Sequence, residues 1–341
     1  MPSPSRITVL FNTDYDAEAA ATDVISVEAS AQAIAVALQD SGFRAELLGM
    51  HGRDVFTVFE RVRANPPELV FNLCESMAGD ARNEPTFVGL LDLFGIPYTG
   101  ADLLALAMCL HKRRTKEILI ARGVPTPPYR FLADPDALDD PALDALDYPW
   151  FVKLAHEDAS VGITQDNLVA SPAALRQRAR ELMDEHHQGV LAERYVEGRE
   201  LNVALIGNPP ALDVLPLHEI DFAAMPADRP RIVSYAAKWD ERHVDYVGTK
   251  PVPLRGASQE LVDSVERTAH AAWDALGLRD YGRIDLRVDG DGPWVIDVNP
   301  NPDISPDAGV ARSARLAGMS YPQLIAHITR VAQQRIAAQR R

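Results

Sequence analysis

One stretch near the end of the chain constrains the fold most: Tyr281-Gly-Arg-Ile-Asp-Leu-Arg-Val-Asp-Gly-Asp-Gly-Pro-Trp-Val-Ile-Asp-Val-Asn299. Polar and apolar residues alternate on both sides of an Asp-Gly-Asp-Gly segment, and Asp-Gly pairs favour tight hairpin turns. Residues two apart in a strand share a face, so Arg283 and Asp285 point the same way, as do Asp297 and Asn299. The stretch therefore predicts a hairpin that gathers both pairs on one surface.

The chemistry of these four side chains indicates a metal site. Asp285, Asp297 and Asn299 offer hard oxygen ligands and Arg283 adds a guanidinium, a set that suits Mg²⁺ or Mn²⁺ with bound phosphate oxygens. A hairpin that merely alternates polar and apolar residues would give the same pattern. The choice between the two depends on whether the rest of the chain supplies a nucleotide site.

Composition limits the class of protein. A chain of 341 residues with 47% hydrophobic and 24% charged residues is typical of a soluble globular protein of two or three domains. A net charge of −15 argues against binding to nucleic acid or anionic membranes, though not against ATP in a local basic pocket. The absence of long apolar runs and of a signal sequence predicts a cytoplasmic protein. Two cysteines, Cys74 and Cys109, fit a reducing compartment, and Cys74 is expected in the core.

Strand and helix patterns alternate over residues 1–100, which predicts an N-terminal parallel α/β domain. No glycine fingerprint follows the first strand, so a dinucleotide-binding Rossmann domain is not expected. The elements predicted here are strands at 7–11 and 69–74, helices at 24–39 and 87–94, and a return to the sheet at 96–100.

The rest of the chain predicts an α+β arrangement. We expect a central small α+β subdomain over residues 101–198 and a C-terminal catalytic domain with a mixed sheet over 199–341, with an Asp- and Pro-rich surface connection at 134–147. The fold class is therefore α/β, with α+β character in the C-terminal half. The remaining predicted elements are two helices within 101–123, strands at 150–154, 190–196 and 201–206, the hairpin at 283–299, and helices at 171–187, 258–276 and 320–338.

Several short phrases, in order along residues 70–325, resemble the ATP-grasp superfamily and most closely its D-alanine–D-alanine ligase group. Each phrase alone is weak evidence, and together at family-like spacing they are strong. They are Phe71-Asn-Leu73, Gly95-Ile-Pro-Tyr-Thr-Gly100, His111-Lys-Arg-Arg-Thr-Lys116, Ser160-Val-Gly-Ile163, Glu197-Gly-Arg-Glu200, Gly282-Arg-Ile-Asp285, Val298-Asn299 and Ala317-Gly-Met-Ser320. The resemblance implies an ATP-grasp fold, ATP as cofactor with two Mg²⁺ ions, and a homodimer.

The resemblance also implies a role for each matching residue. Lys112 and Lys153 would hold ATP phosphates under a loop that contains Ser160, and Lys238 would reach the γ-phosphate from a lid loop. Glu193 and the backbone of Arg194, Tyr195 and Val196 would bind adenine, and Glu200 the ribose hydroxyls. Asp285, Asp297 and Asn299 would hold the metal ions, while Arg283, Lys238 and Ser160 would act on the reacting groups.

The implied reaction is phosphoryl transfer followed by acyl transfer. A carboxylate, expected to be that of an amino acid, attacks ATP to give an acylphosphate, and an amine acceptor then displaces phosphate to form an amide. An intact metal-and-arginine set argues against the alternative of a non-catalytic ATP-binding protein of the same fold.

The sequence departs from the family where substrates bind. The glycine-rich, glutamate-containing turn that the family carries after its first strand is absent, so Asp14, Asp16, Glu18 or Asp23 is left to hold a substrate ammonium. After Asn299 the family's Thr-Ser-Pro-Gly is replaced by Pro300-Asn-Pro-Asp-Ile-Ser-Pro-Asp-Ala-Gly309, which makes Asp303, Ser305 and Asp307 candidate substrate residues. This change favours an amine acceptor other than D-alanine, with D-alanine–D-alanine ligase as the alternative.

Overall fold

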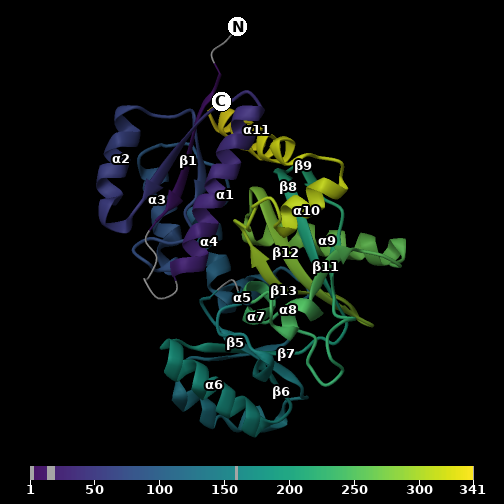
Figure 1. Cartoon of the computed structure of the whole chain (residues 1–341). Helices are drawn as coiled ribbons and strands as arrows, with labels where there is room; N and C mark the ends of the chain where they lie inside the picture. Colours follow the sequence, from purple (N-terminus) through teal and green to yellow (C-terminus); the bar gives the residue numbers. More distant parts are fainter. Residues whose placement is uncertain (1–3, 14–19, 158–159, 341) are drawn as a thin grey trace.

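The N-terminal part of the chain folds around a parallel sheet. The computed structural model describes residues 4–13, 20–157 and 160–340, and its first sheet has the order β2-β1-β3 (Figure 1). The predicted strands at 7–11 and 69–74 and helices at 24–39 and 87–94 are confirmed. The elements are β1 (Arg6–Asn12), α1 (Ala20–Asp40), β2 (Arg44–Met50), α2 (Val55–Ala64), β3 (Leu69–Leu73) and α3 (Glu84–Leu93).

Two elements of this region were not predicted, and one segment that was predicted to join the sheet does not form a strand. In β2 only Leu48 and Met50 are buried, so its sequence shows little of the alternation of apolar and polar residues that predicts a strand. Helix α2 was not predicted either. The segment 96–100 was expected to rejoin the sheet. It forms a single parallel bridge, between Val70 and Tyr98, rather than a strand.

The central part is a small antiparallel sheet of order β4-β7-β5-β6 with one long helix against it (Figure 1). Apolar residues of the sheet and of α6 form its core, joined by Leu138 and Leu143 of the acidic connection. Two helices, α4 (Leu103–Leu110) and α5 (Lys112–Ala121), lead into it. The other elements are β4 (Tyr129–Leu132), β5 (Trp150–Leu154), β6 (Leu168–Val169), α6 (Pro172–His186) and β7 (Val190–Arg194).

The C-terminal part is built on a larger sheet of order β11-β10-β8-β12-β13, with β9 beside β8. Its described strand pairs are all antiparallel, so the prediction of a mixed sheet here is wrong. The predicted hairpin and the helices at 258–276 and 320–338 are confirmed. The elements are β8 (Arg199–Asn208), β9 (Ala211–Val214), β10 (His218–Asp221), α7 (Tyr235–Trp239), α8 (Val244–Gly248), β11 (Lys250–Pro253), α9 (Gln259–Leu276), β12 (Asp280–Asp289), β13 (Gly292–Asn299), α10 (Gly309–Leu316) and α11 (Tyr321–Gln339).

The two faces of the large sheet have different partners. On β8, alternate residues such as Leu201 and Val203 pack with α9, whereas Ala204 and Ile206 pack with α11. Helix α11 also contacts α1, so the N-terminal sheet and the C-terminal sheet share one hydrophobic core. Farther along the α11 side of the sheet, β8 and β12 carry the polar residues Asn202, Arg283 and Asp285. Lys153 of the central part contacts the neighbouring strand at the carbonyl of Ile296. None of the described helices is long and apolar enough to cross a membrane.

Candidate active site

The hairpin formed by β12 and β13 brings the two predicted polar pairs together. Arg283 lies opposite Asn299 and Asp285 opposite Asp297, and the turn closes between Asp289 and Gly292. Directly opposed residues of antiparallel strands share a face. All four polar side chains therefore lie on one surface, because a β-bulge between Asp285 and Leu286 shifts the register by one residue from that of the turn.

The carboxylate of Asp285 is held from three sides. Arg283 donates two hydrogen bonds to it, from Nε at 2.7 Å and from Nη2 at 2.8 Å. The amides of Asn202 on β8 and Asn299 on β13 donate to it at 2.7 Å and 3.1 Å. Because the side-chain amide nitrogen of Asn299 points at Asp285, the side-chain Oδ1 of Asn299 remains available as a ligand.

Asp297 is the more open of the two carboxylates, with 29% of its side chain exposed. Its Oδ1 lies 3.4 Å from the Nζ of Lys112, at the start of α5. Burial alone would raise the pKa of Asp297, but the charges of Lys112, Lys153 and Arg283 hold it below its ordinary value. The group is therefore an anion with a nearby cation, ready to bind a further positive charge.

A buried ionic cluster lies behind this pair. Glu193 on β7 is contacted by Lys116 of α5 at 2.6 Å and by Lys153 of β5 at 2.8 Å. Lys153 also donates to the carbonyl of Ile296 at 2.9 Å, next to Asp297. Burial lowers the pKa of Lys116 to about 8 even though Glu193 opposes the shift. The cluster thus links the central sheet to the hairpin.

The proposed adenine edge has one available backbone donor. The N–H of Arg194 donates to the carbonyl of Pro128 at 2.8 Å, and that of Tyr195 to the carbonyl of Pro149 at 3.1 Å. Among the described residues the N–H of Val196 has no such acceptor. Glu193, predicted to bind the exocyclic amine, has each carboxylate oxygen beside a lysine, so it accepts from a ligand only through its remaining lone pairs.

Glu200 lies at the start of β8 opposite Arg287 of β12. The two side chains are 3.3 Å apart, and Arg287 also lies over the ring of Tyr195. A Cβ on Gly198 would come within 1.9 Å of the Val288 carbonyl, so this close approach of the strands requires glycine. Burial raises the pKa of Glu200, while the charges of Arg287 and Lys238 oppose that rise.

The two loops expected over the phosphates touch each other. The hydroxyl of Ser160 donates to the carbonyl of Val233 at 3.2 Å, and the N–H of Tyr235 donates to the carbonyl of Ile163 at 2.9 Å. Tyr235 begins α7, the helix that carries Lys238. The structure therefore brings Ser160 and the Lys238 helix to the same side of the site.

The predicted substrate residues are less well defined. Asp14, Asp16 and Glu18 lie outside the described residues, and Asp23 lies in α1 with its side chain outside them as well. The carboxylate of Asp303 accepts from the N–H of Ser305 at 2.8 Å and from its hydroxyl at 3.1 Å. Both side chains are thus engaged in a local turn.

The donor set fits a divalent cation that phosphate oxygens help to hold. Among the described residues no group of three or more His, Cys, Asp or Glu side chains is placed to hold a metal ion. The hairpin supplies two carboxylates and one amide oxygen. Mg²⁺ commonly binds through one or two carboxylates together with substrate phosphates and water. The site thus suits a metal ion that arrives with a nucleotide.

Several residues of the site were missed by sequence reasoning. Lys116 follows Lys112 by four residues, a spacing that places both on one side of a helix, and both are buried. Arg287 continues the alternation of Arg283 and Asp285 along β12. Asn202 carried no signal, since its place beside Asp285 depends on how β8 pairs with β12.

Comparisons with known proteins agree on one family. Residues 118–330 match the family model described as D-ala D-ala ligase C-terminus. The D-alanine–D-alanine ligase of Desulforudis audaxviator is 33% identical over 307 residues, covering 90% of this chain and 93% of that protein. An uncharacterized protein, y4sG, of Sinorhizobium fredii is 32% identical and covers 89% and 88%. The structure of D-alanine–D-alanine ligase from Bacillus anthracis complexed with ATP aligns with a TM-score of 0.77 at 20% identity, covering 99% of this chain and 100% of that one.

Proposed function

We propose a reaction and a substrate class from the premise that this chain belongs to the D-alanine–D-alanine ligase family of ATP-grasp enzymes. The chain is an ATP-dependent ligase that joins a carboxylate to an amine. The residue roles and the substrates are our proposal.

The proposed reaction has two steps. A carboxylate oxygen of the first amino acid attacks the γ-phosphorus of ATP, the bond to ADP breaks, and an acylphosphate forms. The amine of the second amino acid then attacks the acyl carbon, the carbon–oxygen bond to phosphate breaks, and the nitrogen loses a proton. The products are an amide, ADP and phosphate.

The residues act mainly by placing positive charge where negative charge develops. Lys112 and Lys153 hold phosphate oxygens, Lys238 contacts the γ-phosphate, and Arg283 stabilises the acyl oxygen. Two Mg²⁺ ions on Asp285, Asp297 and Asn299 would neutralise further phosphate charge. The observation that carries the proposal is the opposition of Asp285 and Asp297 within reach of Lys112.

The adenosine part of ATP fits the adjoining surface. The N–H of Val196 donates to the adenine ring, Glu193 accepts from its amine, and Glu200 binds the ribose hydroxyls. Arg194 and Tyr195 contribute backbone to this edge, while the Arg194 side chain lies over Trp294. These assignments agree with the placement of β7 and the start of β8 beside the hairpin.

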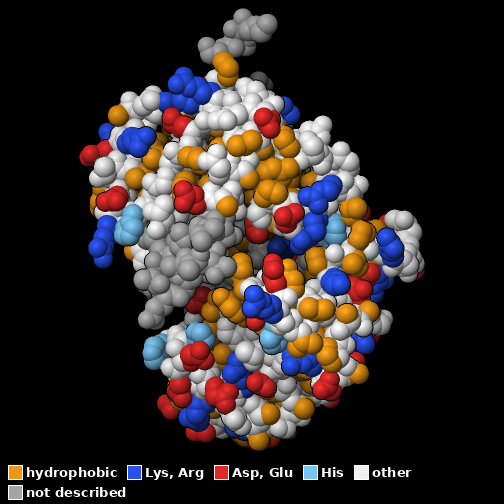
Figure 2. All heavy atoms as spheres, in the orientation of Figure 1, with side chains coloured by type: hydrophobic (Ala, Val, Ile, Leu, Met, Phe, Trp, Pro, Cys, Tyr) orange, Lys and Arg blue, Asp and Glu red, His pale blue; other side chains and the backbone are white. Residues whose placement is uncertain are grey.

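D-alanine is the first amino acid to test for both positions, because relatives over most of the chain are named D-alanine–D-alanine ligase. A second candidate is an acceptor other than D-alanine, because Asp303 and Asp307 stand in the segment that shapes the acceptor pocket in the family. The buried Nε of Arg312 has no hydrogen-bond partner among the described residues, and the charges of Asp303, Asp307 and Arg283 act on this guanidinium. Lys and Arg side chains gather on the surface over α10 (Figure 2). Arg312 would bind a carboxylate of the acceptor.

Product analysis with a panel of amino acids tests this proposal. The enzyme is given ATP, Mg²⁺ and each amino acid in turn, alone and in pairs, and both ADP and amide are measured. Turnover with D-alanine alone would identify the first candidate. Turnover that needs D-alanine together with a different amino acid would identify the second. No amide from any pair would contradict the proposed reaction.

A further inference from the structure

A buried carboxylate outside the reaction site joins two segments of the chain. Asp245 lies in α8 with 2% of its side chain exposed. It accepts hydrogen bonds from Arg229 Nη1 at 2.6 Å, Ser234 Oγ at 2.7 Å and Gln165 Nε2 at 2.8 Å. Burial alone would raise the pKa of Asp245, but these donors hold it below its ordinary value. The group is therefore an anion inside the protein with its acceptors well satisfied.

The three donors come from two parts of the fold. Arg229 and Ser234 belong to a segment that includes α7 and α8, residues 229–248, here called the lid segment. Gln165 belongs to the loop 160–167 of the central part. Asp245 thus ties the lid segment to itself and to that loop. Lys238 lies between Ser234 and Asp245 in the sequence.

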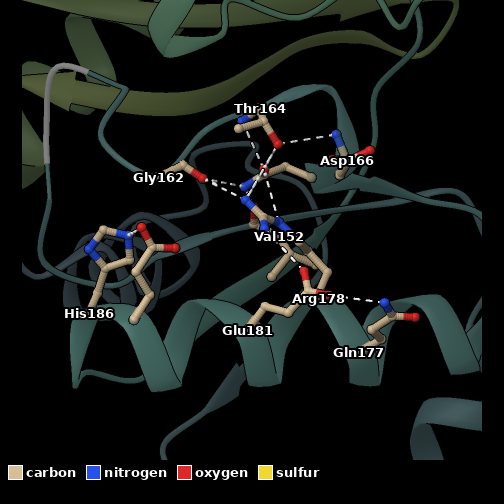
Figure 3. A network of polar contacts seen from close by, with 10 residues as sticks. Val152, Gly162, Thr164, Asp166, Gln177, Arg178, Glu181 and His186 are labelled. Atoms are coloured by element: carbon tan, nitrogen blue, oxygen red, sulfur yellow. Dashed lines mark hydrogen bonds and ion pairs between the residues drawn. The ribbon is translucent and has the colours of Figure 1, made fainter.

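The loop 160–167 is itself anchored at its far end (Figure 3). Arg178 of α6 donates to the carbonyl of Gly162 at 3.1 Å and to Asn167 Oδ1 at 2.9 Å. Asn167 in turn donates to the carbonyl of Val152 on β5 at 2.6 Å, and Thr164 caps the short helical turn that contains Gln165. The loop therefore offers a fixed surface against which the lid segment rests.

Two further contacts run parallel to the Gln165–Asp245 bond. They are the backbone bond from Tyr235 to Ile163 and the bond from the Ser160 hydroxyl to the Val233 carbonyl. Of the three contacts, the one made by Asp245 is the only one between two side chains. A substitution at Gln165 removes it without touching Ser160, whose hydroxyl the family resemblance places beside the reacting groups.

We propose that Asp245 is a positioning residue, which holds the lid segment against the loop 160–167 so that the acylphosphate reacts with the amine and not with water. This role rests on the proposed function. If water attacks instead, its oxygen displaces phosphate, the free carboxylate is regenerated, and ATP is consumed without amide. A lid segment that opens more often admits that water.

Two variants test the role. Asp245→Asn keeps the shape of the side chain but turns an amide N–H₂ toward hydrogen-bond donors. Gln165→Met removes only the hydrogen bond from Gln165 to Asp245, while Arg229 and Ser234 still donate to Asp245. The control is Asp166→Asn, since Asp166 is exposed beside Gln165 and its carboxylate has no bond to the lid segment. The readout is the amount of amide formed per ADP released at saturating acceptor, together with ADP release in the absence of acceptor.

Wild-type enzyme and Asp166→Asn should form about one amide per ADP, as the proposed reaction requires. Asp245→Asn and Gln165→Met should raise acceptor-independent ADP release about tenfold relative to amide formation. If both variants keep the wild-type ratio, the role of Asp245 is wrong. If Asp245→Asn does not fold, Gln165→Met alone decides. If wild-type enzyme forms no amide at all, the proposed function fails and the role of Asp245 fails with it.

Discussion

Asp285 and Asp297 lie directly opposite each other on β12 and β13, and each carboxylate has its own cation. Arg283 holds Asp285 through two hydrogen bonds, and Lys112 lies 3.4 Å from Asp297. Two neighbouring carboxylates repel each other unless positive charge lies between or beside them. Each carboxylate therefore has positive charge beside it, and a divalent cation bound there would be attracted by both.

Removing one of these charges should abolish most activity. Asp297→Asn keeps the size of the side chain and leaves Lys112 in place, but it weakens the binding of Mg²⁺ with ATP. We expect kcat to fall by about 100-fold or more, with partial recovery at higher Mg²⁺ concentration. Steady-state ADP release against Mg²⁺ concentration measures both effects. Asp291→Asn, at the exposed hairpin turn, is the matched control and should behave as the wild type.

Glu193 should be important for stability as well as for ATP binding. Glu193→Gln leaves Lys116 and Lys153 buried beside each other without a negative partner. Breaking a buried ionic cluster in this way costs about 3–5 kcal/mol of the free energy of unfolding. Urea denaturation measures the loss. Glu181→Gln, on the exposed surface of α6, should leave the unfolding midpoint unchanged, and an equal effect of the two substitutions would contradict the assignment.

His218 should make the protein less stable at acidic pH. Burial lowers the pKa of His218, with the charge of Arg312 acting in the same direction. Below pH about 6.5 the unfolded chain binds a proton at this histidine, whereas the folded protein does not. The free energy of unfolding therefore decreases as the pH falls below that value. His218→Gln should show a smaller drop in its urea midpoint between pH 7.5 and 5.5 than the wild type. An equal drop would contradict this role.

Arg312 should govern the affinity for the acceptor. Arg312→Met removes a guanidinium that the charge of Arg283 acts on, and whose buried Nε has no hydrogen-bond partner in the described part of the chain. The loss of one charge-assisted contact should raise KM for the acceptor about 10- to 100-fold with little change in KM for ATP. Arg330→Met, on the exposed side of α11, is the control. An unchanged KM for the acceptor would exclude a role for Arg312 in binding it.

Asp303 tests the second candidate for the acceptor. The acidic residue replaces a glycine of the family, yet its carboxylate is held by Ser305. If the turn shapes the acceptor pocket, Asp303→Gly should change the order of preference within a panel of amino acid acceptors. An unchanged order would show that the substitution has no part in specificity.

Sequence patterns predicted the elements whose residues alternate or repeat regularly along the chain. The alternation and the Asp-Gly turn predicted the hairpin itself, but its final register depends on a β-bulge between Asp285 and Leu286 that the pattern did not predict. The strand β2 could not be predicted in the same way, because only two of its residues are buried. The helices α7 and α8 of the lid segment were not predicted either, because each has only five residues and is stabilised by capping residues and by Asp245.

The site was predicted less completely than the fold. Lys153 was recognisable because a lysine on an apolar strand calls for a negative partner, and that partner is Glu193. The sequence could not show that Lys116 shares this partner or that Asn202 bonds Asp285, because both contacts join segments far apart in the chain. The ammonium-binding residue stays a prediction among Asp14, Asp16, Glu18 and Asp23.

Transfer of an oxygen label tests the central claim most directly. In the proposed reaction one carboxylate oxygen of the substrate attacks ATP and later leaves as part of phosphate. An amino acid labelled with ¹⁸O in both carboxyl oxygens then delivers one labelled oxygen to each phosphate and keeps the other in the amide. Mass spectrometry of the phosphate released during turnover measures this transfer. We predict one ¹⁸O atom in each phosphate formed together with an amide. Unlabelled phosphate would contradict an acylphosphate route.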